Sequence, residues 1–483
     1  MGLKEKTASS IKWNTVATVT TMVISVLQVA ILTRLLEKSD FGLIAIASMV
    51  IAFTDIFAEL GITVALIHKQ NISNEVYSSV YWLNISLSIV ICALTMLGAP
   101  LVAIFYKQPE LTAVIRLLSI KILISAFGKM FQTIKTKNLE FGFISKVRIL
   151  TSVVGIVTST LLAWCGFGVM SLVWGQLVQA IVNQGIYAVA GLKDQRILFH
   201  FSFSEVRDVM KIGGYQLGNQ ILDFIAARLD VFIIGRFFTM DQLGVYNIAK
   251  ELIIKPFSVI NSISSSVFSA AFAKVQDNIQ LVINNYHKIV RFMSMIATPI
   301  YVAMFIFADL LVAILYAPAF SEVALFIRIL SVVGISSAIT SQAAPVMVAL
   351  GRTDLGLHWT IIRVVLSITV ILISASISLY AVAYGQTLLA VMSLVIYFFI
   401  VIRPMFVSIT LKQYISMFIN IVIATLLIAL PFALLNICFV VPVVLQVLMA
   451  IAFMTVYYLY LHKFYRSDLN EIMGIILPNR IKR

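Results

Sequence analysis

The chain has 483 residues, of which 61% are hydrophobic and only 12% are charged. A soluble globular protein carries about 25% charged residues, so this composition excludes a water-soluble fold and predicts a protein that crosses a membrane many times. The net charge of +14 would suggest nucleic acid in a soluble protein. Cytoplasmic loops of membrane proteins are rich in Lys and Arg, so we expect no nucleic-acid partner here.

Fourteen runs of sequence are long and apolar enough for a membrane helix, which needs roughly 20 mostly apolar residues. The first six are expected at about 10–36, 42–67, 77–105, 111–134, 144–166 and 168–190. After a polar stretch, six more are expected at about 212–238, 243–271, 286–316, 322–350, 356–378 and 380–402. Two further runs, at about 413–437 and 440–462, precede a basic tail. The sequence therefore predicts an all-α polytopic membrane protein with 14 transmembrane helices.

Lysine and arginine test this count independently. If the basic N-terminus lies in the cytoplasm, every second connection between helices also lies there. These connections and the C-terminal tail contain most of the lysines and arginines. The basic residues left at the outer ends are few: Arg34, Lys38, Lys107 and Arg236. This asymmetry follows the positive-inside rule and places both termini in the cytoplasm.

The first half of the chain returns in the second half, at an offset between 202 and 212 residues. Residues 33–47 read TRLLEKSDFGLIAIA, and 235–249 read GRFFTMDQLGVYNIA, so that Gly42 aligns with Gly244. LVAIFY at 101–106 returns as LVAILY at 311–316. Each repeat has six helices, and an even number brings the chain back to the side of the membrane where the repeat began. Both repeats therefore have the same orientation in the membrane and are expected to be parallel repeats.

The repeat predicts a division of the chain into four parts. We expect an N-lobe at 1–190, a cytoplasmic linker at 191–211, a C-lobe at 212–404, and two extra helices with a tail at 405–483. The end of the linker, FHFSFSEVRDVMK, is expected to form an amphipathic helix on the inner membrane surface. Two lobes with a cavity between them are the usual design of an alternating-access transporter.

Four stretches carry a family resemblance: LKEKTASSIKW at 3–13, TRLLEKSDFGL at 33–43, YWLN at 81–84 and AFAKVQD at 271–277. With the repeat and the helix count, they make the chain similar to the multidrug/oligosaccharidyl-lipid/polysaccharide flippase superfamily. Within it, the chain resembles the Wzx-type polysaccharide flippases, near the colanic-acid type. The resemblance implies a V-shaped two-lobe fold, a cationic central cavity and the bacterial cytoplasmic (inner) membrane. It also implies that the substrate is an undecaprenyl-pyrophosphate-linked oligosaccharide.

Charged residues at bilayer depth cost about 2.5–3.5 kcal/mol each on insertion scales, so they normally face a cavity or pair with one another. Cations there attract the substrate pyrophosphate, and arginine does so through two parallel hydrogen bonds. The expected pyrophosphate-binding residues are Lys121, Arg228, Lys250 and Lys255. The acids expected to gate or couple transport are Asp55, Glu59, Asp223 and Asp230.

These acids allow more than one role. Asp55 and Glu59 are spaced i, i+4 and share a helix face. The superfamily's helices one and two face seven and eight across the cavity, so we infer an ion pair from this face to Lys250 or Lys255 that opens when substrate phosphates compete. The alternative is that each charge pairs within its own lobe. Asp223 and Asp230 flank Arg228, and Asp223 is alternatively a site for a coupling proton or Na⁺.

Four arginines are expected near the outer interface, as anchors of helix ends. Arg34 and Arg236 are repeat equivalents at the tips of the two outer hairpins. Arg116 and Arg328 are repeat equivalents at the outer starts of the fourth and tenth helices. We expect their roles to be structural and the substrate charges to be read deeper in the membrane.

No phosphate-binding loop of the form G-x-x-x-x-G-K-[ST] occurs, and no catalytic or metal-ligating constellation is found. We therefore expect a transporter and not an enzyme, without a cofactor and with the coupling ion, H⁺ or Na⁺, left open. The expected function is flipping of lipid-linked oligosaccharides, with membrane lipids and polysaccharide polymerase machinery as further partners. The alternatives are a cation-coupled drug or small-molecule antiporter of the same fold, whose cavity should be dominated by acids, and a non-transporting scaffold.

Overall fold

The structure is a computed structural model that describes residues 3–59, 73–439, 441–466 and 468. Helices and the turns between them make up these residues, with no β-strand among them, and this confirms the predicted all-α fold class. The chain forms two compact units, Met1–Asn247 and Ile248–Arg483. The boundary between the units falls inside one long helix.

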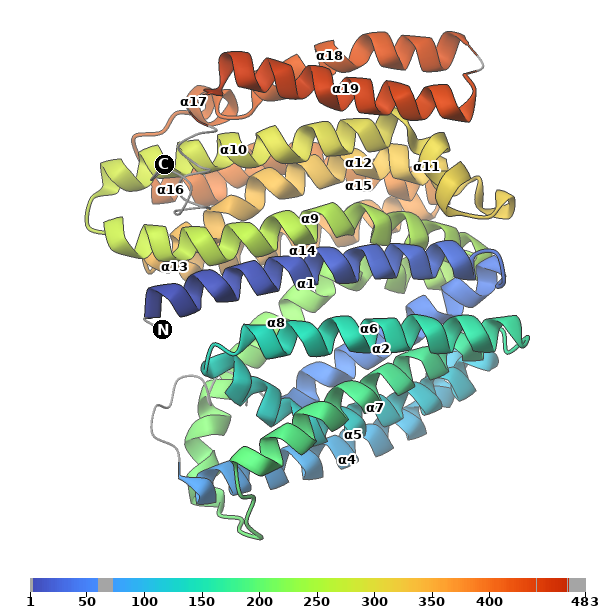
Figure 1. Cartoon of the computed structure of the whole chain (residues 1–483), viewed down its shortest axis with the longest axis vertical. Helices are drawn as coiled ribbons and strands as arrows, with labels where there is room; N and C mark the ends of the chain where they lie inside the picture. Colours follow the sequence, from blue (N-terminus) through green and yellow to red (C-terminus); the bar gives the residue numbers. More distant parts are fainter. Residues whose placement is uncertain (1–2, 60–72, 440, 467, 469–483) are drawn as a thin grey trace. The chain divides into compact units, whose positions relative to one another are not determined.

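The first unit is built from long helices packed side by side. They are α1 (Leu3–Leu32), α2 (Lys38–Glu59), α4 (Asn74–Tyr106), α5 (Glu110–Lys137), α6 (Phe141–Trp164), α7 (Val169–Asp194), α8 (Phe203–Phe237) and the start of α9 (Met240–Val275). Helices α4, α5 and α7 lie side by side (Figure 1), and α6 packs against both α1 and α7. Helix α2 packs against α5 on one side and α8 on another.

The second unit contains the rest of α9 and the C-terminal helices. They are α10 (Ile279–Ile306), α11 (Ala308–Leu315), α12 (Val323–Thr340), α13 (Ala344–Ala349), α14 (Thr353–Ala375), α15 (Leu379–Tyr397), α16 (Arg403–Met405), α17 (Leu411–Ser416), α18 (Ile419–Cys438) and α19 (Val443–Phe464). Figure 1 shows α18 and α19 in red, side by side, and both pack against α10. Short helical turns η1 (Pro318–Phe320), η2 (Ser341–Ala343) and η3 (Phe398–Ile402) join several of these helices.

Eleven helical segments of the described residues are long and apolar enough to span a bilayer. On α4, Leu94, Leu97, Leu101 and Ile104 are exposed and recur every three or four residues, so this helix presents an apolar stripe suited to lipid. The protein is therefore a multi-pass membrane protein. Helices α7, α8 and α9 are not among the eleven segments, so the count of 14 stays a prediction.

Two predicted spans are divided in the structure, and a third changes its helical type at its end. The run 286–316 is divided between α10 and α11, and Asp309 in the first turn of α11 pairs with Arg328 of α12. The run 322–350 is divided by the 3₁₀ turn η2, and 380–402 ends in the π-helical turn η3. Hydropathy shows which residues suit the membrane interior, but it does not show which backbone groups hydrogen-bond to one another. It therefore could not predict where these helices divide or change type.

The linker also differs from its prediction, because it forms no separate amphipathic helix. Helix α7 continues to Asp194, residues 195–202 are irregular, and α8 begins at Phe203. The second part of the predicted surface helix is thus the first part of α8. Residues 195–202 are irregular, but some of their backbone N–H and C=O groups hydrogen-bond to side chains of another helix. These bonds replace some of those that a helix would have supplied.

That element is the start of α4. The backbone N–H groups of Leu198 and Ser202 donate to the hydroxyl oxygens of Ser78 and Ser79, at 2.8 and 3.0 Å. Trp82 Nε1 donates to the carbonyl of Leu198 at 3.0 Å. We call these contacts the linker clip, and they fix 195–202 to the first unit.

The predicted repeat is visible in the packing of consecutive helices. A Cβ atom added at Gly175 of α7 would lie 2.7 Å from Cβ of Ser159 on α6. At its repeat equivalent, Gly385 of α15, it would lie 2.8 Å from a methyl group of Val370 on α14. Both glycines permit close helix approach, which membrane helices favour.

Each unit has its own buried core. In the first, one apolar cluster joins α4, α5, α6 and α7 to the start of α8, with Tyr81, Phe131 and Tyr187 as its largest members. In the second, Phe307 and Phe453 belong to a cluster that joins α10 and α11 to α18 and α19. The two C-terminal helices, which have no repeat counterpart, are therefore held by apolar packing.

Candidate functional site

The two repeated outer stretches meet in the first unit. Helix α2 begins at Lys38 and α9 begins at Met240, which is 202 residues later. A Cβ atom added at Gly42 would lie 2.2 Å from the carbonyl oxygen of Met240. A Cβ atom added at Gly244 would lie 2.1 Å from the carbonyl oxygen of Lys38. The sequence aligned these two glycines, and the structure places the helices that carry them backbone against backbone.

Helix α2 runs antiparallel to α8. Near its start, the side chain of Ile46 lies 3.0 Å from the position of a Cβ atom at Gly235. Further along, the rings of Phe53 and Phe224 lie 5.4 Å apart between centroids. These two contacts show that the helices run in opposite directions. Several of the predicted acids lie on this pair of helices.

Two of these acids lie at the same level of the helix pair. Asp55 follows Phe53 by two residues and Asp223 precedes Phe224 by one, so both carboxylates lie within a turn of that ring contact. Asp55 is half-buried and Asp223 is exposed. The side chain of the other predicted acid on α2, Glu59, lies outside the described residues. The sequence could not show this shared level, because it depends on how α2 and α8 pack.

Asp230 has a defined hydrogen-bonding role. Its carboxylate is buried and accepts a hydrogen bond of 2.8 Å from the hydroxyl of Tyr246. The other carboxylate oxygen lies 2.8 Å from the backbone nitrogen of Val231. Asp230 therefore ties α8 to the start of α9 within one hairpin. Arg228, two residues earlier, is half-buried.

The predicted lysines occupy different elements. Lys250 and Lys255 are half-buried on α9, in the second unit, and Lys255 Nζ lies 3.9 Å from Glu251 on the same helix. Lys121 is half-buried on α5, in the first unit. Among the described residues Lys121 forms no ion pair. The ion pair from Asp55 and Glu59 to these lysines stays a prediction.

The four outer arginines each contact a helical segment, which for Arg34 is the end of the helix that it follows. The guanidinium of Arg34 hydrogen-bonds the carbonyl of Ala30, and that of Arg236 lies 5.5 Å from the ring centroid of Phe105. The repeat equivalents Arg116 and Arg328 both reach back to the preceding helix. Arg116 donates to the Met96 carbonyl of α4 at 3.3 Å, and Arg328 pairs with Asp309 of α11. This shared geometry suits the predicted anchoring role.

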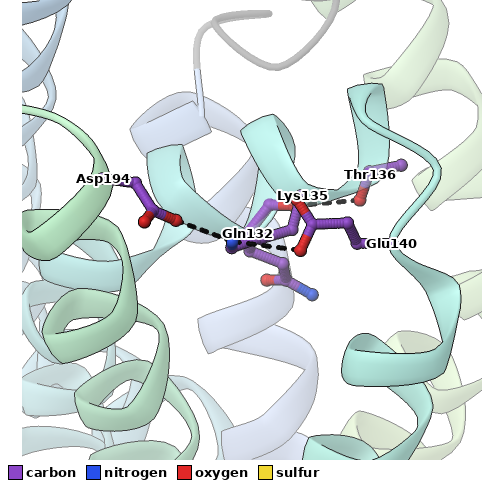
Figure 2. A network of polar contacts seen from close by, with 5 residues as sticks. All are labelled: Gln132, Lys135, Thr136, Glu140 and Asp194. Carbon is purple, nitrogen blue, oxygen red and sulfur yellow. Dashed lines mark hydrogen bonds and ion pairs between the residues drawn. The ribbon is translucent and has the colours of Figure 1, made fainter.

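A separate charged cluster joins three helix ends at the predicted inner side of the first unit (Figure 2). Lys135, near the end of α5, lies 2.8 Å from the carboxylate of Asp194 at the end of α7 and 3.0 Å from that of Glu140 before α6. Because Asp194 is exposed, the cluster contributes roughly 1 kcal/mol or less per pair. Lys135 therefore joins the ends of α5 and α7 to the start of α6.

No group of three His, Cys, Asp or Glu residues in the described part of the chain is arranged to hold a metal ion. The residues of the predicted site are cations and carboxylates. Such groups can bind and release an anionic headgroup without a covalent step.

Comparison with known proteins places this geometry in a family. The model of a family described as "Polysaccharide biosynthesis protein" matches residues 31–325. The lipopolysaccharide biosynthesis protein WzxC of Escherichia coli K12 is 25% identical over 416 residues, which cover 86% of this chain and 84% of that protein. The teichuronic acid biosynthesis protein TuaB of Bacillus subtilis 168 is 24% identical over 351 residues, or 73% of each chain.

Two solved structures share the fold. The lipid II flippase MurJ, in an inward closed conformation, superposes with a TM-score of 0.76 over 94% of this chain and 99% of that chain, at 13% identity. An inward-facing multidrug resistance MATE family transporter of the MOP superfamily gives 0.63 over 81% and 96%, at 15% identity. The resemblance inferred from the four sequence stretches is confirmed. Because the family match spans more than half of its length, the chain belongs to the polysaccharide biosynthesis protein family.

Proposed function

We propose that the protein moves lipid-linked oligosaccharide repeat units from the inner to the outer leaflet of the bacterial cytoplasmic membrane, for the biosynthesis of a surface polysaccharide. The proposed lipid carrier is undecaprenyl pyrophosphate. The observation that carries the proposal is the family match over residues 31–325, joined to a fold shared with a lipid II flippase over 94% of the chain. That likeness supports a lipid-linked substrate as a class.

In this proposal the basic residues at membrane depth receive the pyrophosphate. Lys121 and Arg228 are half-buried in the first unit, and Lys250 and Lys255 are half-buried in the second. Partial burial strengthens their attraction for an anion, because fewer water molecules screen the charges. Asp55, Glu59 and Asp223 supply the opposite charge, for gating or for a coupling H⁺ or Na⁺. No cofactor or covalent chemistry is needed, and both termini stay in the cytoplasm.

A cation-coupled antiporter is the second candidate, because the MATE transporter shares the fold over 81% of this chain. The two candidates differ in the charge that the substrate cavity must present. An antiporter for cationic drugs needs mainly acids, whereas a pyrophosphate needs bases. The predicted site offers four basic residues beside its four acids, which favours the anionic substrate.

The decisive experiment deletes the gene and analyses the lipid-linked sugars by mass spectrometry after mild acid release. We expect lipid-linked repeat units to accumulate in the deletion strain and to return to the wild-type level when the gene is restored. Susceptibility to cationic drugs should not change. If drug susceptibility rises instead while no repeat units accumulate, the protein is an antiporter and this proposal is wrong.

A further inference from the structure

Two long helices of the second unit contain an interior proline, and a tyrosine of another helix donates a hydrogen bond at each of them. Helix α9 contains Pro256, and α10 contains Pro299. A proline has no backbone N–H for the carbonyl four residues earlier, and its ring pushes that carbonyl aside, which opens the turn. In a membrane no water replaces the lost donor, so a neighbouring helix has to supply one. Tyr301 and Tyr457 do so here.

On α10 the replacement is direct. Pro299 cannot donate to the carbonyl of Met295, four residues earlier, and the hydroxyl of Tyr457 on α19 donates to that carbonyl at 3.0 Å. Both residues are buried. The turn at 295–299 reads MIATP and carries no charged residue. This hydrogen bond therefore serves the packing of α19 against α10.

On α9 the tyrosine enters the opened turn itself. The hydroxyl of Tyr301, on α10, donates to the carbonyl of Ile253 at 2.9 Å. The backbone N–H of Phe257, the residue after the proline, donates to the oxygen of the same hydroxyl. Ile253 and Phe257 are four residues apart, so the hydroxyl bridges two backbone groups that pair with each other in a regular helix. A side chain inserted between such groups holds a helix in a bent form.

The ring of Tyr301 is held firmly by other elements. Tyr301 is fully buried, and its ring passes across Gly334 of α12. A Cβ atom added at Gly334 would lie 2.3 Å from a ring carbon of Tyr301, so glycine leaves the space that the ring occupies. The place of the hydroxyl is therefore set by α10 and α12, and α9 has to adapt to it.

The turn that Tyr301 enters carries a basic residue of the predicted site. Lys255 immediately precedes Pro256, is half-buried, and has its Nζ atom 3.9 Å from Glu251 of the preceding turn. The direction of a helical side chain follows from the backbone of its own turn. A proline turn lacks one backbone hydrogen bond, so an outside contact has to fix this backbone.

We propose that Tyr301 is a positioning residue, which fixes the Pro256 turn of α9 and thereby the direction in which Lys255 presents its ammonium group to the substrate pyrophosphate. The proposal rests on the proposed function, in which Lys255 receives the pyrophosphate. Tyr301 does not bind the substrate, because its hydroxyl is buried and is used by the backbone of α9.

The first test is a double-variant cycle in the transport assay. Tyr301→Phe removes the hydroxyl and keeps the ring, and we expect transport, measured as clearance of accumulated lipid-linked repeat units at equal protein level, to fall about five- to tenfold. In a Lys255→Gln background the same change should cost less than about twofold, because Tyr301 acts through Lys255. Replacing Tyr301 by 4-aminophenylalanine keeps an N–H donor and should restore at least half of the transport rate. Equal losses in the two backgrounds would overturn the proposal.

Tyr457→Phe is the matched control. It removes the same kind of hydrogen bond at the other proline turn, where no charged residue lies. We expect Tyr301→Phe and Tyr457→Phe to lower the thermal unfolding midpoint by similar amounts, and Tyr457→Phe to keep transport within about twofold of wild type. If both variants lose transport equally, Tyr301 contributes only to stability and does not position Lys255.

A second test needs no substrate. In purified protein, Tyr301→Phe should raise hydrogen–deuterium exchange of the amides in 253–260 about fivefold, because one hydrogen bond that holds this turn is lost. If Tyr301→Phe yields no monodisperse protein, Gly334→Ala is measured in its place, because the added methyl group displaces the ring. Unchanged exchange at 253–260 would overturn the proposal.

The two tests separate this proposal from the proposed function. If repeat units accumulate in the deletion strain but Tyr301→Phe changes neither exchange nor transport, only the positioning role is wrong. If exchange at 253–260 rises as expected and the deletion strain accumulates no repeat units, Tyr301 fixes the turn and the substrate class is wrong.

Discussion

At the scale of single residues, Asp230 is a buried carboxylate that accepts a hydrogen bond from the hydroxyl of Tyr246. Arg228, Asp230 and Lys255 could be named because a charge in an apolar run is costly. That Asp230 accepts a hydrogen bond from Tyr246 depends on how α8 packs on α9, whereas Lys255 and Glu251 are spaced i, i+4 and already share a face of one helix. The cost of burying a charge is a local property, and the partner of Asp230 is a tertiary one.

Arg228 gives the first prediction at this scale. Arg228→Gln should lower transport at least tenfold, measured as accumulated lipid-linked repeat units, because it removes a charged fork that can hold two phosphate oxygens. Arg228→Lys keeps the charge without the fork and should fall between Gln and wild type. Lys412→Gln, an exposed change on α17, is the control. Equal activity of Arg228→Gln and wild type would remove Arg228 from the substrate site.

The second prediction concerns Tyr246. Tyr246→Phe removes the hydroxyl that donates to the buried Asp230 carboxylate, and we expect a loss of about 1–3 kcal/mol in stability. Thermal unfolding in detergent should show this as a midpoint lowered by several degrees. Tyr384→Phe, at an exposed tyrosine, makes the same chemical change without a buried partner and should have little effect. Equal midpoints for both variants would mean that the Asp230 hydrogen bond contributes nothing to folding.

At the scale of elements, the linker shows how tertiary contacts override a local pattern. The stretch 199–211 was expected to form an amphipathic surface helix, but 195–202 are irregular and α8 begins at Phe203. The hydrogen bonds of Ser78, Ser79 and Trp82 to this segment replace those that a helix would have made. The sequence of the linker does not predict these hydrogen-bond partners, because they lie on α4, more than a hundred residues earlier in the chain.

The linker clip leads to the third prediction. Ser78→Ala removes the acceptor for the Leu198 backbone N–H, and one lost hydrogen bond of about 1 kcal/mol should raise local opening roughly fivefold. Trypsin added to inside-out vesicles should then cut at Lys193 and Arg196 about five times faster than in wild type. Ser86→Ala, at an exposed serine of the same helix, should not change the cleavage rate. Cleavage at the wild-type rate in Ser78→Ala would show that the clip does not restrain the linker.

At the scale of the whole molecule, the predicted topology is tested by the native cysteines, which is the fourth prediction. With both termini inside, the ends of α6 and α18 lie outside, so the exposed Cys165 and Cys438 should face the outer side. A membrane-impermeant maleimide should label both in intact spheroplasts. Cys92, buried within α4, should stay unlabelled and serves as the internal control. Labelling of Cys165 and Cys438 only after permeabilisation would invert the topology.

Fold class, repeat and family follow from the amino-acid sequence, because none of them depends on how the helices pack. About twenty apolar residues form a membrane helix wherever it packs, and motifs can be aligned without a structure. Which helices contact one another is known only from the folded chain. Gly42 and Gly244 aligned in the sequence as equivalent positions, yet their mutual contact exists only because α2 and α9 bring their backbones together. The sequence shows that a residue is glycine, but it does not show which atoms of another helix occupy the space that a side chain would have filled. That depends on how the helices pack.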